Sequence, residues 1–255
     1  MDITVPGDAL IGYLLASVRI VSWLAVVPPF SSHAVPNTAK VVLSLGLAFA
    51  VSPALKETSL PTTVLGLAAE TATQVAIGAA MGFVTFLLLS ALAAAGSLID
   101  VFGGFSLAQG FDPLGMNSNT VFGTFHQMLA TMILFVTNGH MLVLGGLLST
   151  FRFLPVGANP DTSHSTEVIV SGFRVFFVTA VQIALPMIAV LFLADLGLAL
   201  LTKVAPQLNA INVMFPAKIG LTLLLLGLSF PVLPAAMHKM IELSQQAMAA
   251  MAGAG

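Results

Sequence analysis

The sequence predicts an all-α membrane protein with about six long apolar helices arranged in kinked hairpins. Hydrophobic residues make up 58% of the 255 positions and charged residues only 7%, whereas a soluble domain carries about 25% charged residues. The mean hydropathy is +1.04. Several apolar stretches also approach or exceed the roughly 20 residues that a helix needs to cross a bilayer. Because so few charges cannot coat a water-facing surface, lipid or neighbouring protein has to cover these helices.

The first two helices are expected at residues 10–27 and 37–55. The first ends at Pro28-Pro29, where the proline rings stop a helix, and the second closes at Ser52-Pro53. Residues 1–6 lack the basic region of a cleavable signal peptide. The first apolar segment is therefore expected to stay in the mature protein.

The third helix is expected at residues 62–95, after Pro61, a favourable helix-start residue. It carries small residues at spacings that let two helix backbones approach closely in a membrane. These candidate packing residues are Ala72, Ala76, Gly78 and Gly82. An alanine-rich chain also produces such spacings by chance, so that alternative stays open beside helix packing.

The remaining helices are expected at residues 120–151, 167–204 and about 216–250. Pro186 lies inside the fifth and Pro231 inside the sixth. A proline removes a backbone donor and kinks a helix, so both helices are expected to bend.

Two segments interrupt this helical pattern. Residues 96–119 are rich in glycine and contain the turn signal Asp112-Pro113, and residues 206–215 combine a proline with amide side chains. Neither is expected to be helical. In the second, Gln207, Asn209 and Asn212 break the apolar pattern.

The segment 96–119 is unusually apolar for a loop. Phe105, Phe111 and Met116 add bulky apolar tips to a glycine-rich backbone. Irregular backbone at membrane depth survives only where protein buries it or where it lines a cavity. The segment is therefore suited to sealing a pore, with an ordinary surface loop as the alternative, although such loops are rarely this apolar.

Charges inside apolar helices are expensive and are functional candidates. The four candidates are Arg19, Glu70, Arg174 and Asp195. Pairing of an arginine with a carboxylate would offset much of the desolvation cost. A proton relay is the sharper alternative, but the four positions are scattered along the chain. A structural role, or exposure at a polar interface, is therefore favoured.

Several classes of function find little support. The net charge of −2, without a basic run, argues against nucleic-acid binding, and the absence of cysteine removes thiolate chemistry. None of the five histidines forms a metal-binding pair on one helix. Residues 104–108 nearly match the GxSxG motif, but Ser106 would need a strand-to-helix turn. No enzymatic activity, metal or cofactor is expected.

Beyond these local patterns, the sequence resembles the FliR family of flagellar export-apparatus proteins, called SctT in virulence type III secretion systems. The likeness spans nearly the whole chain. It is carried by an ordered set of motifs: Gly104-Phe105-Ser106-Leu107-Ala108 leading into Asp112-Pro113, Asn138-Gly139-His140, Leu154-Pro155-Val156-Gly157, and Ala205-Pro206-Gln207-Leu208-Asn209 through Phe215-Pro216. Lys203, where arginine is commoner, and Met214, where a glycine is expected, depart from the family pattern.

The resemblance implies a subunit of the flagellar export gate in the bacterial inner membrane, within the flagellar basal body. It implies a FliP-like part at residues 1–165 and a FliQ-like hairpin at residues 166–255. The partners implied are FliP and FliQ in a shared channel, and unfolded flagellar proteins as export substrates. The resemblance also implies that FlhB and FlhA meet a polar hairpin tip at residues 203–216, whose candidate contact residues are Pro206, Gln207, Asn209 and Asn212. The pore-sealing residues implied are Phe105, Phe111, Asp112, Pro113 and Met116.

A protein of another class is the alternative: a secondary transporter or channel that acts alone and uses the intramembrane charges. Such proteins often contain inverted repeats and broken helices that converge on a midplane site. No convincing repeat relates the two halves of this sequence, although Pro186 and the break at residues 206–215 would suit one.

Overall fold

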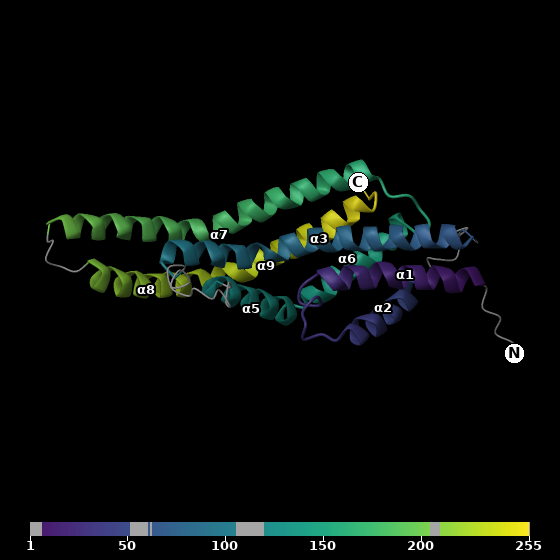
Figure 1. Ribbon diagram of the computed structural model, residues 1–255, viewed down its shortest axis with the longest axis horizontal. Helices are drawn as coiled ribbons and strands as arrows, with labels where there is room; N and C mark the ends of the chain where they lie inside the picture. Colours follow the sequence, from purple (N-terminus) through teal and green to yellow (C-terminus); the bar gives the residue numbers. More distant parts are fainter. Residues whose placement is uncertain (1–6, 52–60, 62, 106–119, 205–209, 255) are drawn as a thin grey trace. The chain divides into compact units, whose positions relative to one another are not determined.

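The computed structural model describes residues 7–51, 61, 63–105, 120–204 and 210–254, and within these ranges it is helical, without strands. Figure 1 shows the order of the helices along the chain. The elements are α1 (Gly7–Val26), α2 (Asn37–Val51), α3 (Val64–Gly103), α5 (Val121–Val136), α6 (Gly139–Phe153), α7 (Thr162–Val204), α8 (Ala210–Ser229), the 3-10 turn η2 (Phe230–Val232) and α9 (Leu233–Met251). The all-α prediction is confirmed.

Four helical segments in the described ranges are long and apolar enough to cross a membrane. They are α1, α3, α7 and the continuous run of α8 to α9, and the broken pair α5 and α6 makes up to five. Helix α2 has 15 residues, too few for a span of roughly 20. The described spans are thus somewhat fewer than the six expected.

Helix α3 runs to Gly103, so the expectation that residues 96–103 form part of a loop is wrong. The apolar residues Leu98, Ile99, Val101 and Phe102 continue the helix past Gly96. Gly96 has a packing role, since a Cβ there would overlap the carbonyl of Phe122 on α5. This glycine therefore permits close contact between two helices rather than a loop.

The expected helix at 120–151 is interrupted at Asn138, which has φ 55° and ψ 20°. Asparagine tolerates this left-handed conformation better than other residues with a Cβ. The expected break at 206–215 is also wrong in its second half, because α8 begins at Ala210 and Pro216 lies inside it. Apolar residues between the amides extend that helix. Pro231 lies in the 3-10 turn between α8 and α9, and α7 continues through Pro186.

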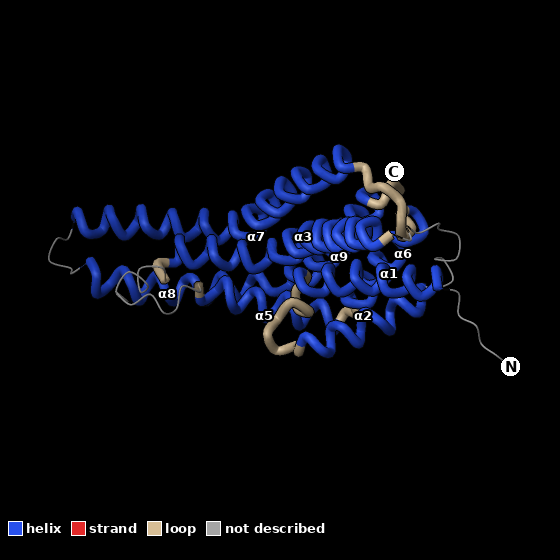
Figure 2. Tube along the Cα trace, turned by 45° about the vertical axis from the view of Figure 1, so that its right-hand side comes forward, coloured by secondary structure: helices blue, strands red, loops and turns tan. Residues whose placement is uncertain are grey.

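The chain forms two compact units, each built from several segments. The first contains the chain up to Leu89, Asn138–Arg174 and the C-terminal part from Met240. In this unit α1 lies beside α2, as Figure 2 also shows. Trp23 and Leu24 of α1 are fully buried, and they belong to the core of this unit.

The second unit contains Ser90–Thr137 and Val175–Lys239. Its core includes Ala95 and Ile99 of α3, Phe122 of α5, Ala184 and Met187 of α7, and Leu226 of α8. The C-terminal half of α7 runs alongside α8 in both views (Figures 1 and 2). This unit brings the end of α3 to the start of α5.

Candidate functional site

The end of α3 meets the start of α5 through the side chain of Asp100, in what we call the α3–α5 junction: Ser97, Asp100, Phe105, Thr120, Phe122 and Gly123. Asp100 Oδ2 accepts the backbone N–H of Phe122 at 2.8 Å and of Gly123 at 3.2 Å. The first amides of a helix lack intrahelical partners, and the N-cap residue Thr120 makes no side-chain capping bond. Asp100 therefore caps α5 from another helix.

A second bond holds the same two helices together. The hydroxyls of Ser97 and Thr120 lie 2.9 Å apart in a hydrogen bond. Gly123 lies so close to both hydroxyls that a Cβ there would overlap them. The junction therefore needs glycine at this position.

The C-terminus of α3 is closed by Gly104, whose φ of +84° is a conformation that favours glycine. The N–H of Phe105 donates to the carbonyl of Asp100 at 3.1 Å, the six-to-one bond of a Schellman motif. Asp100 thus bonds to Phe105 through its main chain and to Phe122 through its side chain.

The ring of Phe105 packs against the ring of Phe122 in an edge-to-face arrangement, with centroids 4.7 Å apart. Such pairs add about 0.5–1.5 kcal/mol to the burial of their surface. Phe105 also packs against the buried core cluster of the second unit. Of the five residues expected to seal a pore, Phe105 is the one that the structure describes, and it lies against this core.

His126 lies one turn further along α5 and is fully buried. Its Nδ1 lies 2.9 Å from the carbonyl oxygen of Phe122, and it contacts the position of Gly96. Sequence reasoning missed both Asp100 and His126. Asp100 stands in the apolar run Leu98-Ile99-Asp100-Val101-Phe102, so the rule for intramembrane charges would have found it had residues 96–103 been recognised as helix.

Side chains of helix α8 lie against the C-terminus of α3. The side chain of Thr222 lies against Gly103, and the aliphatic stem of Lys218 lies against Gly104. Lys218 Nζ donates to Asp195 Oδ2 of α7 at 2.8 Å. The partner of the predicted charge Asp195 is therefore a lysine rather than either candidate arginine.

Arg19 and Glu70 belong to the first unit, where they are linked through a third residue. The fully buried Arg19 donates from Nε to Gln74 Oε1 at 2.6 Å and from a terminal nitrogen to the Leu154 carbonyl at 2.8 Å. Gln74 Nε2 donates to Glu70 Oε1 at 2.7 Å. Among the described residues no ion pair joins Arg19 directly to a carboxylate. The fourth charge, Arg174, is exposed.

The candidate packing residues lie on two faces of α3. A Cβ at Gly78 would overlap the Arg19 carbonyl, and one at Gly82 would press on Trp23, so both glycines lie against α1. Ala72 and Ala76 are exposed, and Ala76 lines a cavity of about 520 Å³. Packing of these two alanines against another helix stays a prediction.

The other candidate residues carry no side-chain description. Phe111, Asp112, Pro113, Met116, Pro206, Gln207 and Asn209 lie outside the described residues, and Asn212 falls within α8 without a described side chain. In the ranges that are described, no group of three or more histidines and carboxylates is arranged to hold a metal ion.

Comparison with known proteins identifies the family. Residues 10–244 match the family described as bacterial export proteins, family 1. The chain belongs to this family. As a bacterial export protein, it is 31% identical over 240 residues to the flagellar biosynthetic protein FliR of Aquifex aeolicus, covering 94% of this chain and 93% of that one. It is 30% identical over 217 residues to FliR of Pectobacterium carotovorum, with 85% and 83% covered.

A relative from a secretion system matches this bacterial export protein as well. The secretion system apparatus protein SsaT of Salmonella typhimurium is 29% identical over 170 residues, covering 66% of this chain and 65% of that one. The resemblance to the FliR family is therefore confirmed. The relatives are export-apparatus proteins, which indicates a structural or transport role in a membrane.

Proposed function

We propose that this protein is a structural subunit of the flagellar type III export gate. In this role it forms, with FliP and FliQ, the channel through which unfolded flagellar proteins leave the cell. The observation that carries the proposal is the family match over residues 10–244, joined by several relatives named FliR. Its location would be the inner membrane, at the flagellar basal body.

The exposed apolar surface of α7 is consistent with contacts to partner subunits in that assembly. Its 43 residues extend about 65 Å at 1.5 Å per residue, about twice the hydrocarbon thickness of a bilayer. Only 22% of its most apolar window is buried, and Phe177, Leu193 and Leu200 are each more than 60% exposed. Lipid alone cannot cover so long an apolar helix, and FliP and FliQ would cover the rest.

The proposed arrangement retains the expected division of the chain. Residues 1–165 would be the FliP-like part and residues 166–255 the FliQ-like hairpin, which contains α7 from its fifth residue onward, α8 and α9. The tip of this hairpin, residues 203–216, would meet FlhB and FlhA.

The proposed seal consists of Phe105, Phe111, Asp112, Pro113 and Met116. The packing of Phe105 supports this proposal. Its ring lies against Phe122 and the core of the second unit, so this member of the seal has a fixed position. A seal that must hold back ions needs such a fixed attachment, since a loosely held side chain leaves gaps through which water passes.

Affinity purification from the native host in mild detergent tests the proposed assembly. FliP and FliQ are expected to co-purify with the tagged chain, in a complex much heavier than one chain. Recovery of a stable solitary chain would contradict the proposal.

Uptake of a solute by the purified chain alone, after reconstitution, would favour a transporter. Arg19 and Asp195, which a transporter would use, already have partners within the chain.

A further inference from the structure

Phe105 is held at its backbone and at its ring by two different parts of the α3–α5 junction. Its N–H bonds to the main-chain carbonyl of Asp100. Its ring rests on Phe122, which is only 4% exposed. The position of Phe105 therefore depends on where the start of α5 lies relative to the end of α3.

The carboxylate of Asp100 makes two of the hydrogen bonds that fix the start of α5 to the end of α3. It is 1% exposed and accepts the two N–H groups of Phe122 and Gly123. A carboxylate at this position also interacts favourably with the partial positive charge of a helix N-terminus. Thr120 makes no capping bond, so Asp100 is the side-chain acceptor that both buried amides would lose.

We propose that Asp100 is the positioning residue that holds Phe105 in the closed export channel. The inference rests on the proposed function, since it concerns the seal in which Phe105 takes part. Asp100 acts through Phe122: it fixes the first turn of α5, this turn presents the Phe122 ring, and the ring supports Phe105. Loss of the carboxylate would free the start of α5 and leave Phe105 without its aromatic partner.

The test uses the full chain, assembled with its natural partners in membranes, and compares Asp100→Ala, Asp100→Ser and Asp100→Asn. Potassium efflux from cells or vesicles measures leakage. Leakage is expected to rise several-fold for Asp100→Ala and less for Asp100→Ser. It should rise least for Asp100→Asn, because asparagine keeps an acceptor oxygen and is a helix cap of nearly equal quality. Equal leakage from all three variants and the wild type would overturn the proposal.

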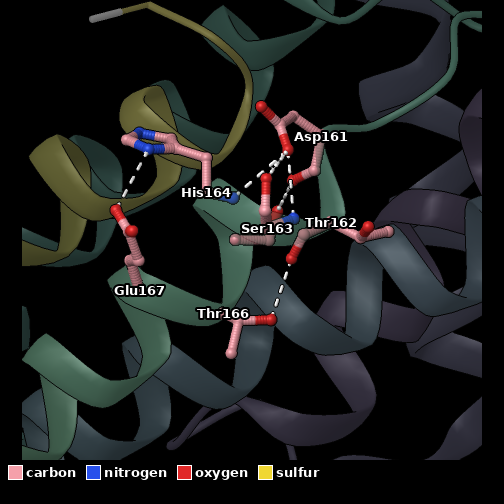
Figure 3. A network of polar contacts seen from close by, with 7 residues as sticks. Asp161, Thr162, Ser163, His164, Thr166 and Glu167 are labelled. Atoms are coloured by element: carbon pink, nitrogen blue, oxygen red, sulfur yellow. Dashed lines mark hydrogen bonds and ion pairs between the residues drawn. The ribbon is translucent and has the colours of Figure 1, made fainter.

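Asp161 supplies a matched control with the same chemistry at another helix. Its Oδ1 accepts the N–H groups of Ser163 and His164 at the start of α7 (Figure 3). Asp161→Ala also removes an aspartate cap, but Asp161 belongs to the first unit, whereas the junction belongs to the second. Unchanged leakage in Asp161→Ala, together with increased leakage in Asp100→Ala, would assign the effect to the junction rather than to capping in general.

A disulfide cross-link measures the junction itself, independently of leakage. The chain contains no cysteine, so Ser97→Cys with Thr120→Cys introduces one specific pair at a site where the native hydroxyls lie 2.9 Å apart. With diamide as the oxidant, the initial rate of cross-linking is expected to fall about tenfold in the Asp100→Ala background. Oxidation of the pair is expected to restore the seal in that background, and a reductant should reopen it.

The outcomes separate this inference from the proposed function. A cross-linking rate that Asp100→Ala leaves unchanged would overturn the inference whatever the leakage. If Phe105→Ala leaks while a loosened Asp100→Ala complex stays tight, the positioning role is wrong and the seal stands. If neither variant leaks in assembled complexes, Phe105 has no sealing role and the inference falls with it. If Asp100→Ala does not assemble, the same leakage and cross-linking measurements are made on Asp100→Ser.

Discussion

The carboxylate of Asp100 lies 2.8 Å from the backbone nitrogen of Phe122, although 22 positions separate the two residues in the chain. This bond joins the end of α3 to the start of α5, the two helices on either side of the segment that carries the proposed seal. It also explains how an acidic residue is accommodated among apolar neighbours, since the carboxylate accepts two buried backbone N–H groups. The proposed function therefore depends on helix capping as well as on the bulk of the sealing side chains.

Replacement of Phe105 and Phe111 by alanine is expected to increase ion leakage several-fold while the complex still assembles. Loss of the Phe105 ring also removes its contact with Phe122 and should cost about 2–3 kcal/mol of stability, somewhat less than for a fully buried phenylalanine. Potassium efflux and co-purification of partners measure the two effects separately. Phe86→Ala, at an exposed position of α3, is the control. Leakage at the wild-type level in assembled complexes would exclude the seal.

Replacement of Gly78 by alanine is expected to destabilise the first unit by about 1–3 kcal/mol, because the added methyl group would overlap the Arg19 carbonyl and push α1 away from α3. Gly46→Ala in α2 is the matched control, since open space surrounds that position. It should be neutral or slightly stabilising, given the higher helix propensity of alanine. Thermal unfolding in detergent gives the comparison. Equal melting temperatures would contradict the close approach of the two helices.

Replacement of Gln74 by leucine is expected to cost about 1.5–3 kcal/mol, because it removes the hydrogen bond that Gln74 accepts from the buried guanidinium of Arg19. The double variant Arg19→Met with Gln74→Leu should be less destabilised than Gln74→Leu alone, since no buried guanidinium with a missing hydrogen-bond acceptor then remains. A thermodynamic cycle over these variants measures the coupling. Additive effects would show that Gln74 does not carry the interaction.

The stability of the first turn of α7 is expected to depend on pH through Asp161. Hydrogen bonds from the Ser163 side chain and from the His164 backbone lower the pKa of its carboxyl below the ordinary value of 3.8. Because the folded-state pKa is depressed, this contribution to stability is complete above pH 3.8 and is lost as the pH falls through the folded pKa. The protection of the Ser163 and His164 amides, which is their exchange rate relative to the intrinsic rate at the same pH, should therefore decrease as the pH falls below 3.8. In Asp161→Ala this protection should be low throughout and lack this step.

Local signals in the sequence predicted part of the proposed site. Gly104 predicted a departure from regular helix because glycine readily takes positive φ, and it ends α3 with φ +84°. Phe105 was recognised by its bulk on a glycine-rich backbone. The role of Asp100 was not predicted, because the same glycines suggested a loop at residues 96–103. In the structure Gly96 packs against α5 and its neighbours are helical. A contact between helices overrode the local preference.

The sequence by itself determined that this is an all-α membrane protein of the bacterial export family. Composition suffices for the first conclusion, since the cost of exposing apolar surface to water depends on its amount, and the family match spans residues 10–244. Only the tertiary structure decided which residues meet: Asp100 with Phe122, Arg19 with Gln74, and Gly78 rather than Ala76 with α1. Hydrogen bonds and close packing depend on distances of a few ångströms between segments far apart in the chain, and residue spacing along one helix does not determine those distances.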